Sequence, residues 1–219
     1  MTNALRRLMK GEDLADREVF ELFLMILDGT SEPEQIAALL VAMGMKGETG
    51  DELAGAARAV RQLGNRLSLS IPAESILDTC GTGGDESRTF NISTATSLVV
   101  ASAGIPVVKH GNRAVSSSSG SADVLSLLGV NTSLLSNEVD DCFRGSGMAF
   151  CLAPLYHPVL KQVAVIRQKL RVPTIFNRLG PLCNPAGAAN QLIGVGKVGW
   201  LKPMAEATQI LGIRRAFLV

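Results

Sequence analysis

The chain has 219 residues, 47% of them hydrophobic and 19% charged, so it can bury a substantial core and does not belong to the disordered class. Its 21 basic and 20 acidic side chains leave a net charge of +1, which argues against a general nucleic-acid-binding or polybasic membrane-binding protein. No apolar stretch approaches the roughly 20 residues of a membrane span, and residues 1–10 lack the apolar core of a signal peptide, so we expect a cytoplasmic protein. The 4 cysteines are widely spaced without a CxxC pair, which predicts free thiols rather than disulfides or a zinc site.

The first part of the chain, residues 1–70, is expected to form a small helical domain. Apolar residues recur at helical spacing over residues 19–27, and Asp28 with Gly29 predicts the end of that helix. Two Ser/Thr-x-x-Glu pairs, the signature of a capping box, predict the starts of further helices. These pairs are Ser31 with Glu34, before a helix through Met45, and Thr49 with Glu52, before a helix ending at Leu63.

Residues 71–219 show a different pattern, in which short strand-like runs alternate with apolar segments of helix length. Helices are expected at 94–103 and 158–169. Strands are expected at residues 75–80, 107–110, 148–153, 174–177, 191–195 and 216–219. This alternation predicts an α/β fold with a largely parallel sheet, so that a small N-terminal helical domain precedes a larger α/β domain.

The sequence Asp-Thr-Cys-Gly-Thr-Gly-Gly-Asp at 78–85 follows the first expected strand and precedes the helix that Asn-Ile-Ser-Thr opens at 91–94. Glycines allow backbone amides to crowd round an anion, and a helix N-terminus adds its positive dipole end. The spacing is neither the Walker pattern nor the GxGxxG dinucleotide pattern. An ordinary tight strand-to-helix turn is the alternative and the default for a lone glycine-rich loop, and the helix start at 91–94, whose Ser93 and Thr94 hydroxyls could bind phosphate or magnesium, weakens that default.

A second polar segment, residues 109–117, follows the strand expected at 107–110. Lys109 and Arg113 suit phosphate, and the carboxyl ends of strands in open α/β sheets are where ligands bind. A solvated loop with chance charges is the alternative. In this context the serine-rich run at 116–121 is interpreted as a continuation of the phosphate-facing loop rather than as a flexible linker.

Other residues are ambiguous from the sequence alone. Arg167 lies on an expected helix, where it is either a surface arginine or one aimed into a cleft, and the surface interpretation is the default. His157 before a proline is interpreted as a capping or packing residue, and the segment 177–185 as a rigid turn set by its prolines. Neither Cys80 nor Cys183 has a base nearby in sequence, so neither is assigned a nucleophilic role.

Taken together, the segments at 81–85, 91–94, 109–113 and 177–185, in this order, resemble the anthranilate phosphoribosyltransferase family of tryptophan biosynthesis. The resemblance runs along the whole chain. It implies a nucleoside-phosphorylase-like phosphoribosyltransferase fold, a small helical domain that pairs two copies into a homodimer, and the substrates anthranilate and 5-phosphoribosyl 1-pyrophosphate with Mg²⁺. It implies no nucleic-acid or membrane partner.

The resemblance also implies residue roles. The residues similar to those that hold 5-phosphoribosyl 1-pyrophosphate are Gly81, Gly84, Asp85, Thr89, Asn91, Ile92, Ser93, Thr94, Lys109, His110, Gly111, Asn112, Arg113, Ala114, Val115, Ser116, Ser117 and Ser121. Gly81, Asn112 and Arg167 match the anthranilate contacts, which reverses the default for Arg167, and Ser93 matches the metal ligand. No residue is assigned as a catalytic acid or base, because the aniline-type amine is neutral at pH 7 and the reaction needs alignment and charge neutralisation.

The sequence departs from the family pattern in two places. Glu86 stands where the family commonly has glycine, and the adjacent Asp-Glu pair that binds metal in the family lies beyond the strand expected at 216–219. We therefore expect the chain to lack the C-terminal part of the family's fold. Three alternatives stay open: a pyrimidine-nucleoside phosphorylase-like enzyme, a non-catalytic binding protein, and an inactive fragment of the same fold.

Overall fold

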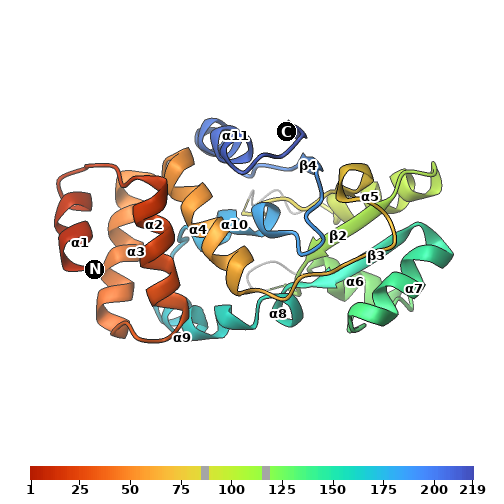
Figure 1. Ribbon diagram of the computed structural model, residues 1–219, viewed down its shortest axis with the longest axis horizontal. Helices are drawn as coiled ribbons and strands as arrows, with labels where there is room; N and C mark the ends of the chain where they lie inside the picture. The colour runs from red at the N-terminus through yellow and green to blue at the C-terminus, as the bar shows by residue number, and fades with distance from the viewer. Residues whose placement is uncertain (85–88, 115–118) are drawn as a thin grey trace.

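The computed structural model describes residues 1–84, 89–114 and 119–219. Its first elements are helices that lie side by side at one end of the molecule (Figure 1). They are α1 (Thr2–Leu8), α2 (Asp16–Leu27), α3 (Pro33–Lys46) and α4 (Gly50–Leu63). Leucine, isoleucine, alanine and methionine side chains from this bundle form one buried core. No helix in the described ranges is long and apolar enough to cross a membrane.

The two expected capping boxes have different outcomes. At α4, the Thr49 hydroxyl accepts a hydrogen bond from the Glu52 amide and the Glu52 carboxylate accepts one from the Thr49 amide, so this capping box is confirmed. The capping box at Ser31 is wrong, because α3 begins at Pro33 with Glu32 as its N-cap and the Ser31 hydroxyl donates to the Met25 carbonyl. Proline fixes the helical φ at the first position, which starts the helix there without a side-chain cap.

Replacing Thr49 with alanine is expected to lower the free energy of unfolding by about 1 kcal/mol, because the Glu52 amide loses its capping acceptor. Ser31→Ala is the matched control and should change it by less than about 0.5 kcal/mol, since Ser31 caps no helix. Urea denaturation followed by circular dichroism measures both. Equal losses of unfolding free energy for the two variants would contradict the assignment of Thr49 as the helix cap.

A 5-stranded sheet, entirely parallel, forms the second part, with the order β3-β2-β1-β4-β5. The strands are β1 (Leu77–Asp78), β2 (Val107–Gly111), β3 (Met148–Leu152), β4 (Asn190–Ile193) and β5 (Arg215–Leu218). The helical elements of this part are η1 (Ala73–Ser75), α5 (Ile92–Ser102), α6 (Ser121–Leu127), α7 (Ser136–Ser146), α8 (Ala153–Tyr156), η2 (Pro158–Leu160), α9 (Lys161–Leu170), α10 (Phe176–Leu179), η3 (Gly180–Cys183), η4 (Val198–Trp200) and α11 (Leu201–Ile210). The prediction of an α/β fold with a parallel sheet is confirmed.

One predicted strand is wrong. The segment 174–177 leads into helix α10 rather than joining the sheet. The Asn177 side chain accepts a hydrogen bond from the Thr174 amide, and the Asn177 amide donates back to the Thr174 carbonyl. This local turn satisfies the backbone without a strand partner, as asparagine side chains commonly do.

The helical bundle and the α/β part share a core. Val163 on α9, Phe176 on α10 and Met204 on α11 are buried in the same cluster as the leucines of α2 to α4. On η3, the Leu182 carbonyl accepts a hydrogen bond from Arg61 of α4 at 2.6 Å, and Arg178 of α10 forms a buried ion pair with Glu48. The segment that follows β3 is therefore anchored to the bundle, as the position of α9 and α10 in Figure 1 also shows.

Candidate anion site at the carboxyl edge of the sheet

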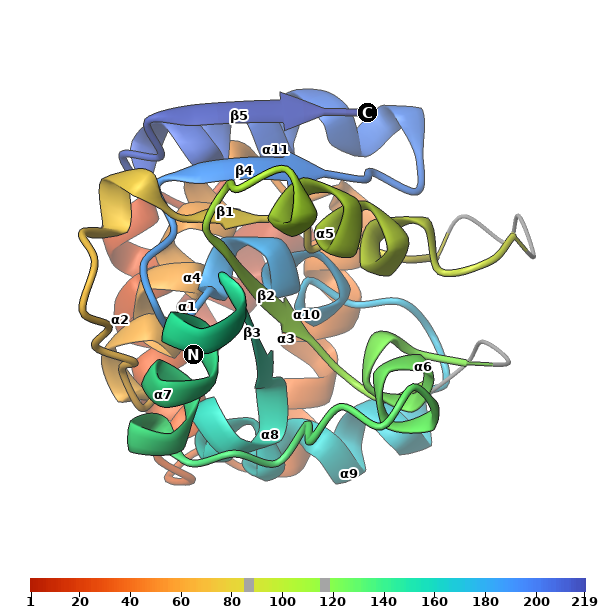
Figure 2. The same ribbon diagram turned by 90° about the vertical axis from the view of Figure 1, so that its right-hand side faces the viewer.

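The sheet reverses its direction of growth between β1 and β4. The chain adds β2 and then β3 on one side of β1 and returns to pair β4 with the other side. In open α/β sheets, ligands bind in the crevice beyond the carboxyl ends of the strands at such a point. Figure 2 shows the connections that leave β1 and β2 on the same side of the sheet, each leading to a helix.

The glycine loop, residues 79–84, leaves β1 and is fastened to the loop that leaves β4. The Thr82 amide donates to the Gly194 carbonyl at 2.8 Å, and the Thr82 hydroxyl accepts from the Gly196 amide at 3.0 Å. A Cβ on Gly81 would lie 2.9 Å from the same Gly194 carbonyl, so only glycine fits at this close approach. Gly83 and Gly84 have φ values of 64° and 76°, a left-handed backbone that glycine adopts without strain.

The N-terminus of α5 lies next in the chain and is open to an anion. Its first turn has no acidic residue, and no described side chain caps it. Thr79 holds the helix start in place by donating to the Ser93 carbonyl at 2.8 Å. The Thr94 hydroxyl is buried and has no hydrogen-bond partner in the described part of the chain. The amides of Ile92 and Thr94 already donate to the Phe90 and Asn91 carbonyls, so the helix dipole and the Thr94 hydroxyl are what favour a phosphate here.

Asn91 joins the first polar loop to the second. Its side-chain amide donates to the Ser119 carbonyl at 3.2 Å, and its side-chain oxygen accepts from the Ser119 hydroxyl at 3.0 Å. The loop after β1 and the segment before α6 are therefore held together. This contact brings residues from both predicted phosphate loops to one edge of the sheet.

Lys109 lies beneath the glycine loop rather than in solvent. Its side chain is 1% exposed, and its ammonium donates to the Thr79 carbonyl and hydroxyl, each at 3.3 Å. Asp78 is equally buried; burial raises the pKa of its carboxyl group, and the positive charge of Lys109 opposes that rise. A buried cation under a loop of amides favours a negatively charged ligand above it.

The Asp78 carboxylate organises the start of the loop. It accepts hydrogen bonds from the Cys80 and His110 amides and, at 2.8 Å, from the Asn184 side chain. Asn184 also donates to the Val108 carbonyl at 2.8 Å. The prolines of 177–185 predict a rigid turn but not this role of Asn184, for which a polar asparagine next to a proline is the available signal.

The loop after β2 is shaped by Asp123 of α6. The Asp123 carboxylate accepts from the Ala114 and Gly120 amides at 2.8 Å and forms an ion pair with Arg113. These amide bonds, followed by the Arg113 pair, lower the pKa of Asp123. The Asn112 side chain is exposed and accepts from the Arg113 amide, so both the amide group and the guanidinium lie at the surface of this loop.

Cys80, Cys183 and the two imidazoles are too buried to act as nucleophiles. Burial raises the pKa of the Cys80 thiol, and raises the pKa of the Cys183 thiol to about 12, so both stay protonated at neutral pH. His110 and His157 pack edge to face with centroids 5.2 Å apart, and burial lowers the pKa of each to about 4. The expectation that His157 packs rather than reacts agrees with this geometry.

Arg167 is half-buried on α9, with its guanidinium 5.3 Å from the centroid of the Phe176 ring. Burial lowers the pKa of Arg167. The side chain therefore lies partly over an aromatic ring of the shared core, and its predicted role as an anthranilate contact stays a prediction. No described contact joins Arg167 to Gly81 or Asn112.

The remaining expected site residues fall into three groups. Gly111, His110 and Ser121 lie where β2 ends and α6 begins, while Thr89 and Ile92 are exposed beside the start of α5. Asp85, Val115, Ser116 and Ser117 lie outside the described residues, as does Glu86. Within the described ranges, no group of three or more His, Cys, Asp or Glu side chains could hold a metal ion.

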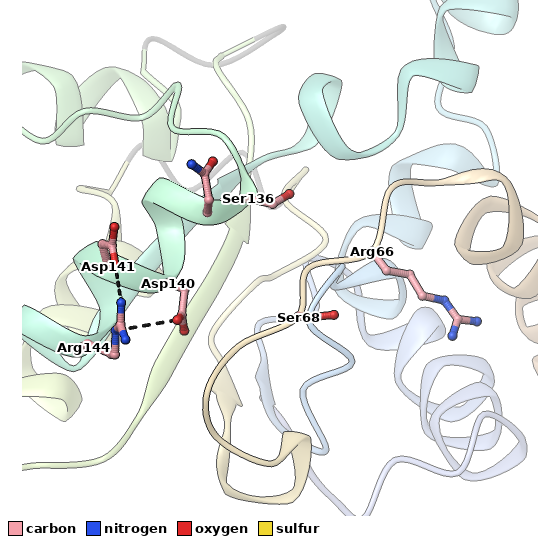
Figure 3. A pocket seen from close by; sticks show the side chains of 7 residues that line it. Arg66, Ser68, Ser136, Asp140, Asp141 and Arg144 are labelled. Carbon is pink, nitrogen blue, oxygen red and sulfur yellow. Dashed lines mark hydrogen bonds and ion pairs between the residues drawn. The ribbon is translucent and has the colours of Figure 1, made fainter.

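A surface pocket lies away from this edge, between the segment that follows α4 and helix α7 (Figure 3). It has a volume of about 420 Å³. Arg144 pairs there with Asp140 and Asp141, and Asp140 accepts from the Ser70 amide and hydroxyl. Because Arg66 and Arg144 line the pocket together with Asp140 and Asp141, it offers an anion no net positive charge.

Comparison with known proteins agrees with the two-part architecture. Residues 2–64 match the glycosyl transferase family, helical bundle domain, and residues 73–219 match the glycosyl transferase family, a/b domain. The chain belongs to this glycosyl transferase family. Within the family, it is 46% identical over 219 residues to the anthranilate phosphoribosyltransferase of Bacillus thuringiensis subsp. konkukian, covering 100% of this chain and 64% of that relative.

Solved structures of the same family share the fold. The crystal structure of anthranilate phosphoribosyltransferase from Thermus thermophilus has a TM-score of 0.88 and 42% identity, covering 95% of this chain and 63% of that one. The enzyme from Saccharomyces cerevisiae in complex with PRPP and Mg has a TM-score of 0.89 and 27% identity, covering 99% of this chain and 64% of that one. The chain thus spans about 64% of the length of the curated relatives it matches.

Proposed function

We propose that the protein transfers the phosphoribosyl group of 5-phosphoribosyl 1-pyrophosphate to the amine of anthranilate and releases pyrophosphate. The observation that carries the proposal is the convergence of the glycine loop, the open N-terminus of α5 and the loop after β2 at the switch point of the sheet. The names of the relatives and the yeast complex with PRPP and Mg support the same substrates. A cytoplasmic homodimer, paired through the helical bundle, is part of the proposal.

The proposed reaction forms a bond between the anthranilate nitrogen and C1 of the ribose while the C1–oxygen bond to pyrophosphate breaks. The electron pair leaves with the pyrophosphate, and the amine proton passes to solvent. The chain's own contribution is to align the two substrates and to neutralise the departing charge. The amides of residues 81–84, the end of α5, Lys109 and Arg113 are suited to the second task.

Magnesium enters the proposal with the substrate, as the magnesium complex of 5-phosphoribosyl 1-pyrophosphate. Magnesium needs several oxygen ligands, and the described residues offer hydroxyls at Ser93 and Thr94 rather than a cluster of carboxylates. Phosphate oxygens of the substrate and water would therefore supply most of its ligands. Ser93 remains the predicted protein ligand.

Loss of anthranilate fluorescence in the presence of 5-phosphoribosyl 1-pyrophosphate and magnesium tests the proposal. We expect turnover to need both substrates, and no cleavage of thymidine with phosphate. Cleavage of thymidine instead would support the pyrimidine-nucleoside phosphorylase alternative. Salt-sensitive binding of nucleic acid without turnover would support the non-catalytic alternative.

Gly81→Ala is expected to lower kcat/KM by about 100-fold, because a Cβ at this position would lie 2.9 Å from the Gly194 carbonyl and displace the glycine loop. Gly145→Ala is the control, since a Cβ there meets nothing within 4 Å. Steady-state kinetics of the two variants measures the difference. A Gly81→Ala enzyme as active as the control would contradict the placement of the site.

Arg167→Ala is expected to weaken anthranilate binding by about 10-fold or more, because a guanidinium that faces a carboxylate loses a charge-assisted hydrogen bond. The affinity for 5-phosphoribosyl 1-pyrophosphate should stay within about twofold of the wild-type value. Titration followed by anthranilate fluorescence measures the first affinity, and calorimetry the second. Lys169→Ala, an exposed cation on the same helix, is the control. Equal losses for both ligands would argue that Arg167 acts only through the stability of the core.

A further inference from the structure

The loop that leaves β4 carries a cation and an aromatic ring to the same edge of the sheet. Gly194 and Gly196 in this loop are hydrogen-bonded to Thr82 of the glycine loop, at 2.8 Å and 3.0 Å. Lys197 follows directly, and Trp200 lies at the end of η4. The residues at 194–200 are therefore neighbours of the candidate anion site, although no sequence motif pointed to them.

Trp200 is held in place from the core side. The guanidinium of Arg178 lies 4.6 Å from the centroid of its ring, and Arg178 is itself fixed by the buried ion pair with Glu48. The edge of the same ring faces the glycine loop, because a Cβ built on Gly84 would lie 3.9 Å from the Trp200 Cη2 atom. Trp200 thus connects the end of the glycine loop to the helical bundle through Arg178 and Glu48.

Lys197 is exposed, and its ammonium lies 5.4 Å from the centroid of the Trp200 ring. Of the carboxylates that the structure describes, none pairs with it, whereas Lys202 pairs with Glu206 and Arg113 with Asp123. An exposed cation that rests on a partly buried ring is held only weakly there and remains free to bind a stronger partner. An ammonium on a flexible stem suits phosphate as a point charge.

We propose that Lys197 binds the diphosphate of the phosphorylated ribose donor, and that Trp200 positions Lys197 and the glycine loop for it. The proposal rests on the proposed function for the identity of the donor. The proposed diphosphate site is lined by three segments: the glycine loop, the N-terminus of α5 and the loop after β4. Lys109 lies on β2 and Lys197 follows β4, so the two positive charges reach the site from opposite sides of β1.

The test uses Trp200 as its own reporter, because it is the only tryptophan in the chain (Trp 1). Magnesium 5-phosphoribosyl 1-pyrophosphate and magnesium pyrophosphate are titrated separately into the chain, and the change in tryptophan emission is checked by calorimetry. Lys197→Ala is expected to weaken binding of both ligands by about 10-fold, the loss of one charge-assisted contact. Lys197→Arg should keep most of the wild-type affinity, and Lys202→Ala should leave the affinity within about twofold of the wild-type value.

The thermal unfolding midpoint of Lys197→Ala should match that of wild type, since the side chain is exposed. If wild type and Lys197→Ala bind both ligands equally well, this inference is overturned and the proposed function stands. If wild type binds pyrophosphate but shows no preference for 5-phosphoribosyl 1-pyrophosphate, and Lys197→Ala weakens that binding, the inference holds and the proposed function loses support. Failure of wild type to bind either ligand overturns both.

Discussion

Replacing Asp78 with alanine is expected to lower the free energy of unfolding by about 3 kcal/mol or more. The carboxylate is 1% exposed and accepts from the Cys80 amide, the His110 amide and the Asn184 side chain. Each buried donor left without an acceptor costs about 1–3 kcal/mol, although such losses are not additive. The ammonium of Lys109 also loses a buried counter-charge. Urea denaturation measures the loss.

Asp140→Ala is the matched control, because Asp140 also accepts from a backbone amide and a side chain, those of Ser70, but at the surface. Its expected loss is much smaller than that of Asp78→Ala, since water can replace the missing acceptor. A double variant with Asn184→Ala tests the network directly. Coupling between Asp78 and Asn184 of at least about 0.5 kcal/mol is expected for residues in one hydrogen-bond network, and simple additivity would contradict it.

The loss of stability in acid is the second large effect that we expect. His110 donates from Nδ1 to the Gly180 carbonyl at 2.9 Å, and His157 donates from Nε2 to the Cys183 carbonyl at 2.8 Å. Carbonyl oxygens only accept, so each ring carries a proton at that nitrogen. A second proton on His110 would go to Nε2, which is buried without a partner in the described part of the chain. Burial accordingly lowers the pKa of both to about 4.

Because the pKa in the folded state lies below the ordinary value of 6.5, the unfolded chain binds more protons between these two values. The free energy of unfolding is therefore expected to fall as the pH drops from about 6.5 to about 4, by about 3 kcal/mol for each histidine. The chain has only 2 histidines, and a histidine variant separates their contribution from that of Asp78, whose pKa burial raises and whose effect in this window has the opposite sign. Asp28, Asp123 and Asp140, whose pKa values are lowered, lose their contributions only below about pH 4.

Urea denaturation at closely spaced pH values measures this effect. His157→Gln should remove about half of the histidine contribution to the fall in unfolding free energy between pH 6.5 and pH 4, because one of the two histidines is gone. A free energy of unfolding that stays constant over this window in wild type would show that the imidazoles are not buried as described.

The sequence predicted the classes of element and their order better than it predicted the site. Alternation of strand-like and helical segments was enough for the parallel sheet, and the Thr49 box was enough for the start of α4, because both are local patterns. The strand predicted at 174–177 was wrong because the turn that Asn177 forms with Thr174 is a local alternative that composition does not distinguish from a strand.

The site itself depends on contacts between distant segments. The strand order, which no single segment encodes, produces three of these contacts. Lys109 is buried under the glycine loop, Asn184 donates to Asp78, and Gly194 accepts from Thr82. For the same reason, Arg167 could not be placed on Phe176 until α9 and α10 were seen to share the core of the helical bundle. Motifs identified the loops, whereas topology determined which side chains meet.

Hydrogen–deuterium exchange with and without magnesium 5-phosphoribosyl 1-pyrophosphate tests the central claim most directly, because it locates the ligand on the chain. We expect slower exchange at residues 79–84, 91–94 and 109–114, the segments that meet at the carboxyl edge of β1 and β2. Exchange at residues 136–144, which line the pocket beside α7, should stay unchanged. Protection confined to 136–144, or no protection of the glycine loop at a saturating ligand concentration, would contradict the account.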